Sequence, residues 1–320
     1  MKVMLLAAGE GTRFRPHTIV QPKPAIPALN IPLSYYSLFL INNFSPLEVI
    51  ANTFHLPEKV VSCLNPLKKS LKSLNFSHEE KLLGSGGGLF HAKKYFQNEK
   101  NFILMNADEI ILPHSASELK SALQIHEKNK ALSTLIVMDH PEVGSKFGAV
   151  WLDTNHKVIG FGKTKPAAAM QGYHFIGMQF LSDRIFNYLP DGESNILTDG
   201  LLNGIKAGET VQVYKINTLW FETGNLQDFL IANHQCLKLL KSENELLNGI
   251  TKMHAAESEL IENSKGIFFI DRTAQVNVNQ LSGFAVIGAN AKVSPSVEIK
   301  NSVVGSHVVV DKSIEGNLAI

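Results

Sequence analysis

Apolar runs and polar stretches alternate along the first two-thirds of the chain, in blocks that match single strands and helices. Short apolar runs predict buried strands, which we expect at 3–6, 47–52, 101–105, 132–138 and 210–216. Helical spacing predicts helices between them, at 34–43, up to Leu64, and at 89–96, 115–129, 195–206 and 226–240. Ser115-Ala116-Ser117-Glu118 predicts a capping box for the helix at 115–129, and Asn225 predicts the N-cap of the last helix. Paired strands are also expected at 147–150 and 158–161. This alternation favours an α/β fold with a doubly wound, mainly parallel, Rossmann-like sheet covered on both faces.

The pattern changes near the C-terminus, where aliphatic residues recur every six positions. Ile287, Val293 and Ile299 keep this spacing, and Val304 and Val310 resume it after a one-residue slip. A hexapeptide repeat is the sequence signature of a parallel β-helix. We therefore expect a short C-terminal β-helix, whose apolar end packs on the first domain or on another subunit of a homo-oligomer.

Length and composition bound the domain organisation. With 320 residues, of which 44% are hydrophobic, the chain can bury one large core and carry an appendage. We expect a first domain at 1–240, a helical linker at 241–265 and the hexapeptide-repeat domain at 266–320.

Charge and cysteine content exclude several classes of protein. The formal net charge is +1 and charged residues make up 18% of the chain, so no global basic field favours nucleic acid or an anionic membrane. Cys63 and Cys236 each fall in an apolar helical pattern, which predicts buried thiols. The first apolar run breaks at Gly9, too soon for a signal peptide, and no run approaches the ~20 residues of a membrane span. We expect a cytoplasmic protein whose partners are small molecules.

The first apolar run ends in a loop, Gly9-Glu10-Gly11-Thr12-Arg13, whose composition is typical of a phosphate site. Glycine lets bare backbone N–H groups approach an anion, and arginine supplies charge and forked donors. A dinucleotide-binding turn does not fit, because Phe14 stands where its third glycine should be. A P-loop does not fit either, because no Gly-Lys-Ser/Thr closes the loop.

Together with Pro22-Lys23-Pro24, this loop resembles the signature of the sugar-1-phosphate nucleotidyltransferases, the nucleotidyl transferase family of NDP-sugar pyrophosphorylases. Several members of that family carry a hexapeptide-repeat tail, a left-handed β-helix. The resemblance implies that the loop holds a nucleoside triphosphate and that a lysine, stiffened here by flanking prolines, reaches its phosphates. The residues so implied are Ala8, Gly9, Gly11, Thr12, Arg13 and Lys23.

Two further stretches match the family. Asp108 follows a predicted strand within Asn106-Ala107-Asp108, and carboxyl ends of parallel strands are where open α/β sheets bind ligands. The family's Asn-x-Asp motif implies that Asp108 binds Mg²⁺. A glycine-rich stretch at 82–89, preceded by Glu80, offers backbone against which a flat ring can lie, and the resemblance implies that Gly84 and Gly87 contact the nucleobase.

The second half matches the family with three departures. Lys165 corresponds to a sugar-phosphate lysine, but Thr164 stands where the family has glutamate. Phe175 replaces an asparagine. Glu222 replaces the aspartate of the family's Trp-x-Asp-x-Gly motif, and the resemblance implies that this residue is the second metal ligand. Glutamate keeps the oxygen chemistry that Mg²⁺ requires. The resemblance also implies that Gly148 and Gly177 contact the sugar phosphate.

The implied reaction transfers a nucleoside monophosphate from a nucleoside triphosphate to a sugar 1-phosphate, with Mg²⁺ as cofactor and pyrophosphate as product. The three departures leave an alternative open, a non-catalytic regulatory subunit that binds a nucleotide or an NDP-sugar. Neither the base nor the sugar is determined. A mannose-1-phosphate guanylyltransferase is one candidate, while glucose 1-phosphate, UTP, dTTP and N-acetylated sugars remain open.

Overall fold

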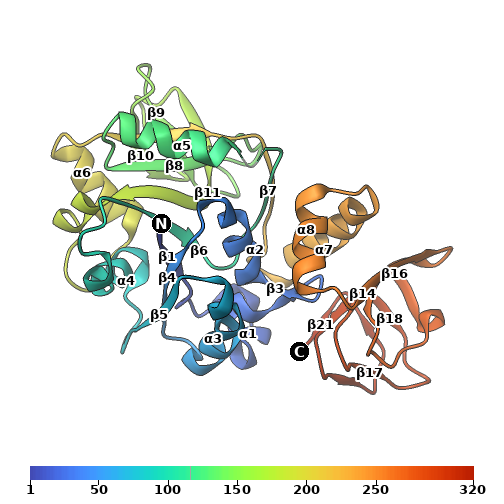
Figure 1. The fold of residues 1–320 in the computed structure, drawn as a ribbon. Helices are drawn as coiled ribbons and strands as arrows, with labels where there is room; N and C mark the ends of the chain where they lie inside the picture. The colour runs from blue at the N-terminus through green and yellow to red at the C-terminus, as the bar shows by residue number, and fades with distance from the viewer. Residues whose placement is uncertain (116) are drawn as a thin grey trace. The chain divides into compact units, whose positions relative to one another are not determined.

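The computed structural model describes residues 1–115 and 117–320 (Figure 1). Spatial contacts divide the chain into two units, and each is described by itself. Unit 1 comprises Met1–Gly9, Leu40–Ala107 and Pro113–Trp220, and unit 2 comprises Glu10–Phe39, Asp108–Leu112 and Phe221–Ile320. These units are defined by spatial contacts, and each contains three separated segments of the chain. They therefore do not test the predicted domain ranges, which stay a prediction.

Unit 1 is built on a nine-stranded sheet in the order β10-β9-β11-β6-β1-β4-β5, with β8 beside β11 and β12 beside β8. The strands are β1 (Lys2–Leu6), β4 (Glu48–Thr53), β5 (Ser73–His78), β6 (Asn101–Asn106), β8 (Ser133–Met138), β9 (Ala149–Leu152), β10 (Val158–Gly162), β11 (Gln171–Ser182) and β12 (Val211–Lys215). All five strands predicted from apolar runs are present, and the paired strands predicted at 147–150 and 158–161 are β9 and β10.

The four strands from the N-terminal third of the chain, β1, β4, β5 and β6, form a parallel part of the sheet. β1 pairs in parallel with β4 and with β6, and β4 pairs in parallel with β5. Val3, Met4 and Leu5 are all fully buried, as expected for a strand whose two faces are both covered. The long strand β11 runs antiparallel to β6, β8 and β9, so it joins this parallel region to the second half of the sheet.

The helices of unit 1 are α3 (Pro57–Leu64), α4 (Gly84–His91), α5 (Ser117–Lys128) and α6 (Leu202–Lys206), which continues a π-helical turn at Ile196–Leu201. Helix α4 begins five residues before the predicted start, so the glycine-rich stretch is helical rather than a loop. The predicted cap of α5 forms in part. Ser115 Oγ accepts a hydrogen bond from the Ser117 N–H, whereas Glu118 accepts one from the Asn217 N–H. Ala116 of that motif lies outside the described residues.

Unit 2 contains α1 (His17–Val20), most of α2 (Leu33–Leu40), α7 (Leu226–Lys241) and α8 (Glu245–His254). Asn225 caps α7 as predicted, because its side chain accepts the Asp228 N–H. A short strand pair of this unit is β2 (Pro27–Ala28) with β3 (Ile31–Pro32). Strands β7 (Ile110–Pro113) and β13 (Thr218–Phe221) are each divided between the two units. Cys236 of α7 is buried as predicted, and burial raises the pKa of its thiol to about 12. Cys63 of α3, in unit 1, is only half-buried, so the prediction of a buried thiol is wrong there.

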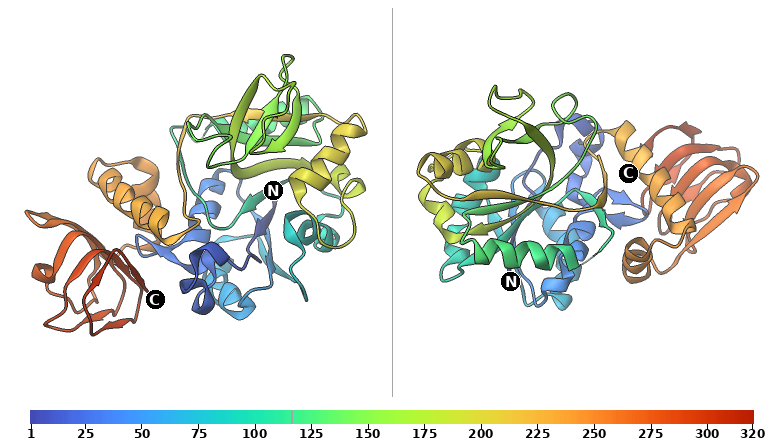
Figure 2. Two further views of the ribbon diagram at one scale, coloured as in Figure 1. Left: turned by 180° about the vertical axis from the view of Figure 1, so that it is seen from behind. Right: turned by 90° about the horizontal axis from the view of Figure 1, so that it is seen from above.

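The C-terminal part of unit 2 stacks parallel strands, which Figure 2 shows in red. They are β15 (Gly266–Asp271), β16 (Leu281–Ile287), β17 (Lys292–Val293), β18 (Ile299–Val304), β19 (Val309–Val310), β20 (Ile314–Glu315) and β21 (Leu318–Ala319). β16 pairs in parallel with β15 and with β18. The five aliphatic residues that mark the hexapeptide period belong to one buried cluster, so the period does predict the core of this region.

Strand β14 and helix α7 both contact the C-terminal strands. Strand β14 (Ser258–Asn263), which was expected in the linker, pairs antiparallel with β15. Helix α7 contacts β14, β15 and β18, and His234 on α7 stacks on Phe284 of β16 with ring centroids 5.0 Å apart. The C-terminal strands therefore pack on a helix of the same chain.

Candidate functional site

In unit 2, the buried ammonium of Lys23 meets the carboxylate of Asp108. The Lys23 Nζ to Asp108 Oδ2 distance is 2.5 Å, although 85 positions separate the two residues. Lys23 begins a single 3₁₀ turn, Lys23–Ala25, directly after Pro22, and its side chain is 11% exposed. Two prolines restrict the backbone around Lys23, so the chain holds this charge in a fixed place.

The surroundings of Lys23 are negative. Burial by itself lowers the pKa of Lys23, but the negative charge of Asp108 raises it. Glu109, the hydrogen bond to Asp108, and Glu222 raise it further, so the net pKa lies above the ordinary value for lysine. The ammonium is therefore charged at neutral pH, and the carboxylates around it favour a cation.

The 222–224 segment of the same unit approaches Asp108. Thr223 Oγ1 donates a hydrogen bond to the Asp108 carbonyl at 2.6 Å, and Glu222 Oε1 accepts the Gly224 N–H at 2.5 Å. A Cβ added to Gly224 would lie 2.3 Å from Glu222 Oε1 and 2.8 Å from Arg13 Nη2. Gly224 thus leaves room for both of these side chains, and the structure brings together four predicted residues, Arg13, Lys23, Asp108 and Glu222.

A packed phenylalanine anchors the turn that carries Arg13. Phe14 is 1% exposed and meets Phe229 of α7 edge-on, with ring centroids 5.4 Å apart. The Gly11 carbonyl accepts the Thr18 Oγ1 hydroxyl at 2.8 Å, and Gly11 has a φ of 61°, in the left-handed region that glycine adopts readily. Thr12 and Arg13 are exposed. The apolar anchor therefore presents a polar, cationic turn to solvent.

The donor set of this cluster fits a hard divalent cation. Mg²⁺ takes oxygen ligands and keeps several waters, so it needs only one or two carboxylates from the protein. Asp108 and Glu222 supply two, and both are half-buried. The Lys23 ammonium already rests on Asp108, which shows that this carboxylate accepts a positive partner. Within residues 1–115 and 117–320, no group of three or more His, Cys, Asp or Glu side chains offers a complete metal cage.

In unit 1, a buried side-chain relay joins the end of β1 to the glycine-rich stretch. Asn52 Oδ1 accepts the Ala7 N–H at 2.8 Å, and Asn52 Nδ2 donates to Glu79 Oε1 at 2.7 Å. Glu79 Oε2 in turn accepts the Leu83 N–H at 2.9 Å. Glu79 is 1% exposed, whereas Glu80 is exposed. The sequence analysis named Glu80 and missed Asn52 and Glu79. Through these hydrogen bonds, Asn52 and Glu79 connect the backbone at Ala7, before Gly9, to the backbone at Leu83, before Gly84.

The glycines of α4 allow close backbone packing. A Cβ on Gly87 would lie 2.1 Å from the Gly192 carbonyl oxygen, and one on Gly84 would lie 2.6 Å from the Ser194 carbonyl oxygen. The Gly86 N–H donates to that Ser194 oxygen at 2.9 Å. By contrast, no atom lies within 4 Å of a Cβ built on Gly9. The space beside Gly9 is open, so a ligand can approach its backbone, and the contacts of Gly84 and Gly87 with a base stay a prediction.

The predicted sugar-phosphate residues belong to unit 1. Lys165 is exposed in the segment after β10, close in sequence to the exposed Lys163. Gly177 has a φ of 79°, at an irregularity where β11 shifts register against β8. Gly148 is exposed just before β9. Phe175, the departure from the family's asparagine, packs against the hydrophobic core of unit 1. The roles of Lys165, Gly148 and Gly177 stay predictions.

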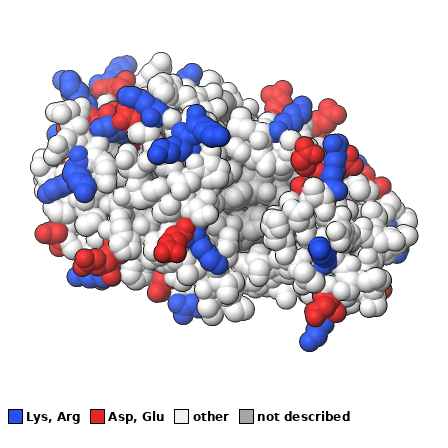
Figure 3. All heavy atoms as spheres, turned by 60° about the horizontal axis from the view of Figure 1, so that its bottom comes forward, with Lys and Arg blue, Asp and Glu red and all other residues white. Residues whose placement is uncertain are grey.

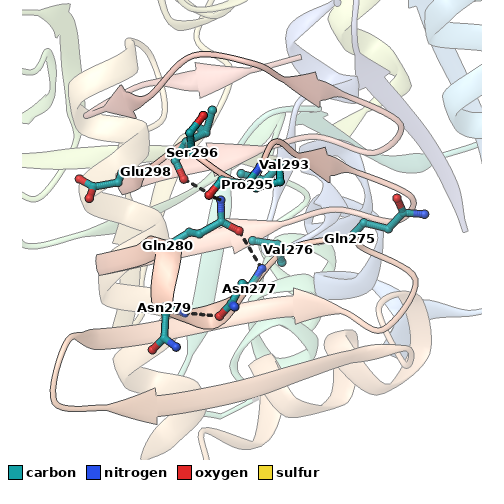
Figure 4. Close-up of a pocket in the computed structure, with 10 residues that line it drawn as sticks. Gln275, Val276, Asn277, Asn279, Gln280, Val293, Pro295, Ser296 and Glu298 are labelled. Atoms are coloured by element: carbon teal, nitrogen blue, oxygen red, sulfur yellow. Dashed lines mark hydrogen bonds between the residues drawn. The ribbon is translucent and has the colours of Figure 1, made fainter.

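The hollow on the C-terminal strands of unit 2 does not resemble a phosphate site. A hollow of about 580 Å³ on the C-terminal strands (Figure 4) is lined by Gln275, Val276, Asn277, Asn279, Gln280, Val293, Pro295, Ser296, Val297 and Glu298. These residues include no lysine or arginine to meet a phosphate charge.

On the face drawn in Figure 3, charged side chains of both signs are interspersed and wide areas carry none, which agrees with the absence of a single-sign field.

Comparisons with known proteins agree with these motifs. The model of one family, "Nucleotidyl transferase", matches residues 2–238. A UTP–glucose-1-phosphate uridylyltransferase of Synechocystis is 28% identical over 243 residues, which are 72% of this chain and 61% of that protein. The catalytic subunit beta of a mannose-1-phosphate guanylyltransferase of Dictyostelium discoideum is 26% identical over 256 residues, 78% of this chain and 69% of that protein.

Solved structures share the fold. A UDP-glucose pyrophosphorylase complexed with UDP-glucose superposes with a TM-score of 0.61 at 19% sequence identity, covering 74% of this chain and 98% of that one. The aligned region spans 61% of the length of the Synechocystis relative. The nucleotide-diphospho-sugar transferase α/β fold is therefore shared.

Proposed function

The chain belongs to the nucleotidyl transferase family, and we propose that it transfers a nucleoside monophosphate from a nucleoside triphosphate to a sugar 1-phosphate, releasing pyrophosphate. One observation carries the proposal. A buried lysine and an exposed arginine gather with two half-buried carboxylates in unit 2, at Lys23, Arg13, Asp108 and Glu222. Fixed cations meet phosphate charge, and half-buried carboxylates meet a metal ion.

The reaction needs little covalent chemistry from the protein. A phosphate oxygen of the sugar 1-phosphate attacks the α-phosphorus, an O–P bond forms, and the bond from the α-phosphorus to the bridging oxygen breaks as pyrophosphate leaves. The nucleophile is already ionised, so no general base is required. Lys23 and Arg13 neutralise the triphosphate, and the open backbone at Gly9 lets phosphate oxygens approach its N–H group. The same role for Gly11 rests on the family resemblance.

Asp108 and Glu222 are the residues that would hold Mg²⁺. When bound, the metal supplies charge neutralisation on the phosphate oxygens. Lys23 then has two roles, because its ammonium balances Asp108 before substrate binds and reaches phosphate afterwards. Glutamate at 222 is longer than the family's aspartate by one methylene, and its hydrogen bond with the Gly224 N–H fixes where the carboxylate lies.

The remaining predicted contacts are proposed on the family resemblance. Thr12 and the backbone at Ala8 complete the triphosphate contacts, and Gly84 and Gly87 contact the base. Lys165, Gly148 and Gly177 contact the sugar phosphate. The relay from Ala7 through Asn52 to Glu79 supports the base contacts, because it fixes the backbone at Leu83 next to Gly84.

The C-terminal strands are proposed to form a short left-handed β-helix, on the strength of the six-residue period and the parallel pairing. A homo-oligomer through this β-helix is part of the proposal. In the described part of the chain, no helix combines the length and apolar composition that crossing a membrane requires. We propose a cytoplasmic location.

The direct test is pyrophosphate release by the purified protein with Mg²⁺, for each nucleoside triphosphate against a panel of sugar 1-phosphates. We expect release that requires one particular pair and stops when the metal is removed with a chelator. Release with no sugar 1-phosphate present would instead indicate simple hydrolysis. If no pair gives product while a nucleotide still raises the melting temperature, the chain is a binding subunit and the proposal is wrong.

A glycine variant tests the packing around Glu222 and Arg13. In Gly224→Ala, the new Cβ would overlap Glu222 Oε1 and crowd Arg13 Nη2. Both are ends of side chains that can move, so we expect an intact fold, and displacement of charged groups by about 1 Å can cost ~10²-fold in turnover. We expect kcat to fall by roughly that factor, while the melting temperature changes by only a few degrees. Wild-type kcat would show that neither side chain needs its present position.

A further inference from the structure

Four aromatic rings of unit 1 form one cluster, His140, Phe147, His174 and Trp220. All six ring pairs have centroids between 4.2 and 5.9 Å apart. The shortest of these distances, 4.2 Å, joins His174 and Trp220. The rings come from distant parts of the sequence, since His174 lies on β11 and Trp220 on β13. The fold therefore assembles this aromatic cluster, which no role described above uses.

Within the described residues, His174 has no hydrogen-bond partner for either ring nitrogen, although both nitrogens are buried. The side chain is 7% exposed. Burial, followed by the charge of His140, lowers the pKa of His174 to about 4, so the ring is neutral at pH 7. A neutral imidazole carries one N–H donor and one acceptor nitrogen. Buried polar atoms without partners are rare in native structures. We therefore expect the ring nitrogens of His174 to bind a ligand.

The rest of the cluster supplies apolar walls. Phe147 and Trp220 stand at 90° to each other with centroids 5.1 Å apart, and both are half-buried. His140 is already engaged, because its Nδ1 lies 3.1 Å from the Glu142 N–H and accepts it. Both ring nitrogens of His174 therefore remain available, one as a donor and one as an acceptor, between aromatic faces.

We propose that the aromatic cluster is the subsite for the acetamido group of an N-acetylated sugar 1-phosphate, with His174 as the specificity-determining residue. An acetamido group offers an N–H and a carbonyl, either of which can pair with one ring nitrogen of His174, and a methyl group that suits aromatic walls. The inference rests on the proposed function, because it names the sugar of that reaction.

The chemistry disfavours the other sugars. A sugar with only hydroxyl groups places polar groups against Phe147 and Trp220, where no charged or carboxamide side chain of the cluster receives them. Elsewhere in the same half of the chain, Thr164 stands where the family's glutamate would accept sugar hydroxyls, and Phe175 replaces the family's asparagine. Because His174 is covered, a ring must turn to admit the group, and Trp220 is the nearest half-buried ring.

Matched pairs of sugar 1-phosphates test the proposal. Pyrophosphate release is measured with glucose 1-phosphate against N-acetylglucosamine 1-phosphate, and with galactose 1-phosphate against N-acetylgalactosamine 1-phosphate. We expect wild type to favour the acetylated member of at least one pair about tenfold or more in kcat/KM. His174→Phe should remove that preference by raising KM for the acetylated sugar about 10- to 100-fold. His174→Gln retains a donor and an acceptor and should keep part of it.

A matched control and a second readout separate this inference from the proposed function. His234→Phe makes the same change in a ring stacked on Phe284 of unit 2, and should leave the sugar preference unchanged. Tryptophan fluorescence, compared with that of Trp220→Phe, reports sugar binding without turnover, since Trp151 is the only other tryptophan.

Each outcome decides one or both proposals. Turnover without an acetamido preference, with His174→Phe affecting both sugars of a pair equally, overturns the inference and leaves the proposed function standing. No turnover, together with a Trp220 signal for the acetylated sugar that His174→Phe abolishes, supports the inference and contradicts the proposed function. Neither turnover nor a fluorescence change with any sugar contradicts both.

Discussion

Replacing Asp108 by asparagine is expected to slow pyrophosphate release about a thousandfold, within the range found when a charged group that stabilises a transition state is removed. The substitution removes the negative charge of a proposed metal ligand. It also leaves the buried ammonium of Lys23 without the carboxylate that lies 2.5 Å away. Both effects disturb the positive charge that would neutralise the pyrophosphate as it leaves.

Asp139→Asn is the matched control. Asp139 also pairs with a lysine, Lys215, at 3.0 Å, but its side chain is 71% exposed, and exposed pairs contribute little to stability. We expect wild-type kcat in this variant. Steady-state pyrophosphate release is compared for the two variants, with circular dichroism to establish that both are folded. An Asp108→Asn enzyme with wild-type kcat would mean that Asp108 holds no metal in the reaction.

The same variant separates an enzyme from a regulatory subunit. A nucleotide sensor that needs no metal should keep its ligand binding in Asp108→Asn, as measured by the nucleotide-induced rise in melting temperature. An enzyme that uses Asp108 for metal binding should lose turnover, and the effect of Mg²⁺ on that rise should disappear with it.

The fold was predictable where burial makes a simple pattern. Strand β1 reads as an unbroken apolar run because both of its faces are covered. Strand β5 was not predicted, because it lies at the edge of the sheet and only Leu74, Phe76 and Ser77 of its middle residues face inward to any degree. Edge strands carry polar residues on their open side, so they lack the apolar run by which strands are recognised.

The site was predictable where a local motif marks each residue. Lys23 lies between prolines and Asp108 lies at a strand end, so each could be singled out without knowing that they meet. Asn52 and Glu79 gave no such signal. They are polar residues at strand ends whose value comes from buried hydrogen bonds, and nothing in the sequence distinguishes buried Glu79 from exposed Glu80.

The glycine-rich stretch shows how one composition can be interpreted in two ways. Four glycines in five residues predicted a backbone surface for a flat ring, with a helix only from Leu89, whereas they form the first turns of α4. Glycine is a poor helix former, so local propensity argues against this helix. Tertiary packing decides otherwise, because the backbone at 192–196 approaches α4 too closely for side chains.

Gly87→Ala is therefore expected to destabilise the protein strongly, although alanine is the better helix former by up to about 1 kcal/mol. The new Cβ would lie 2.1 Å from the Gly192 carbonyl oxygen and 3.0 Å from Leu83 Cβ. Because the first of these is backbone, α4 or the 192 segment must move, and overpacking of this kind costs about 3 kcal/mol. We expect the melting temperature to fall by roughly 6–10 °C.

Gly249→Ala makes the same change in the interior of α8 and serves as the control. Its Cβ would meet only the half-buried ring of Phe39, at 3.0 Å, and a side chain can give way where a carbonyl cannot. We expect its melting temperature to stay within about 2 °C of wild type, since the helix propensity of alanine offsets the small displacement. Scanning calorimetry of both variants tests the argument. Equal melting temperatures would mean that α4 moves without cost, and that its glycines have another purpose.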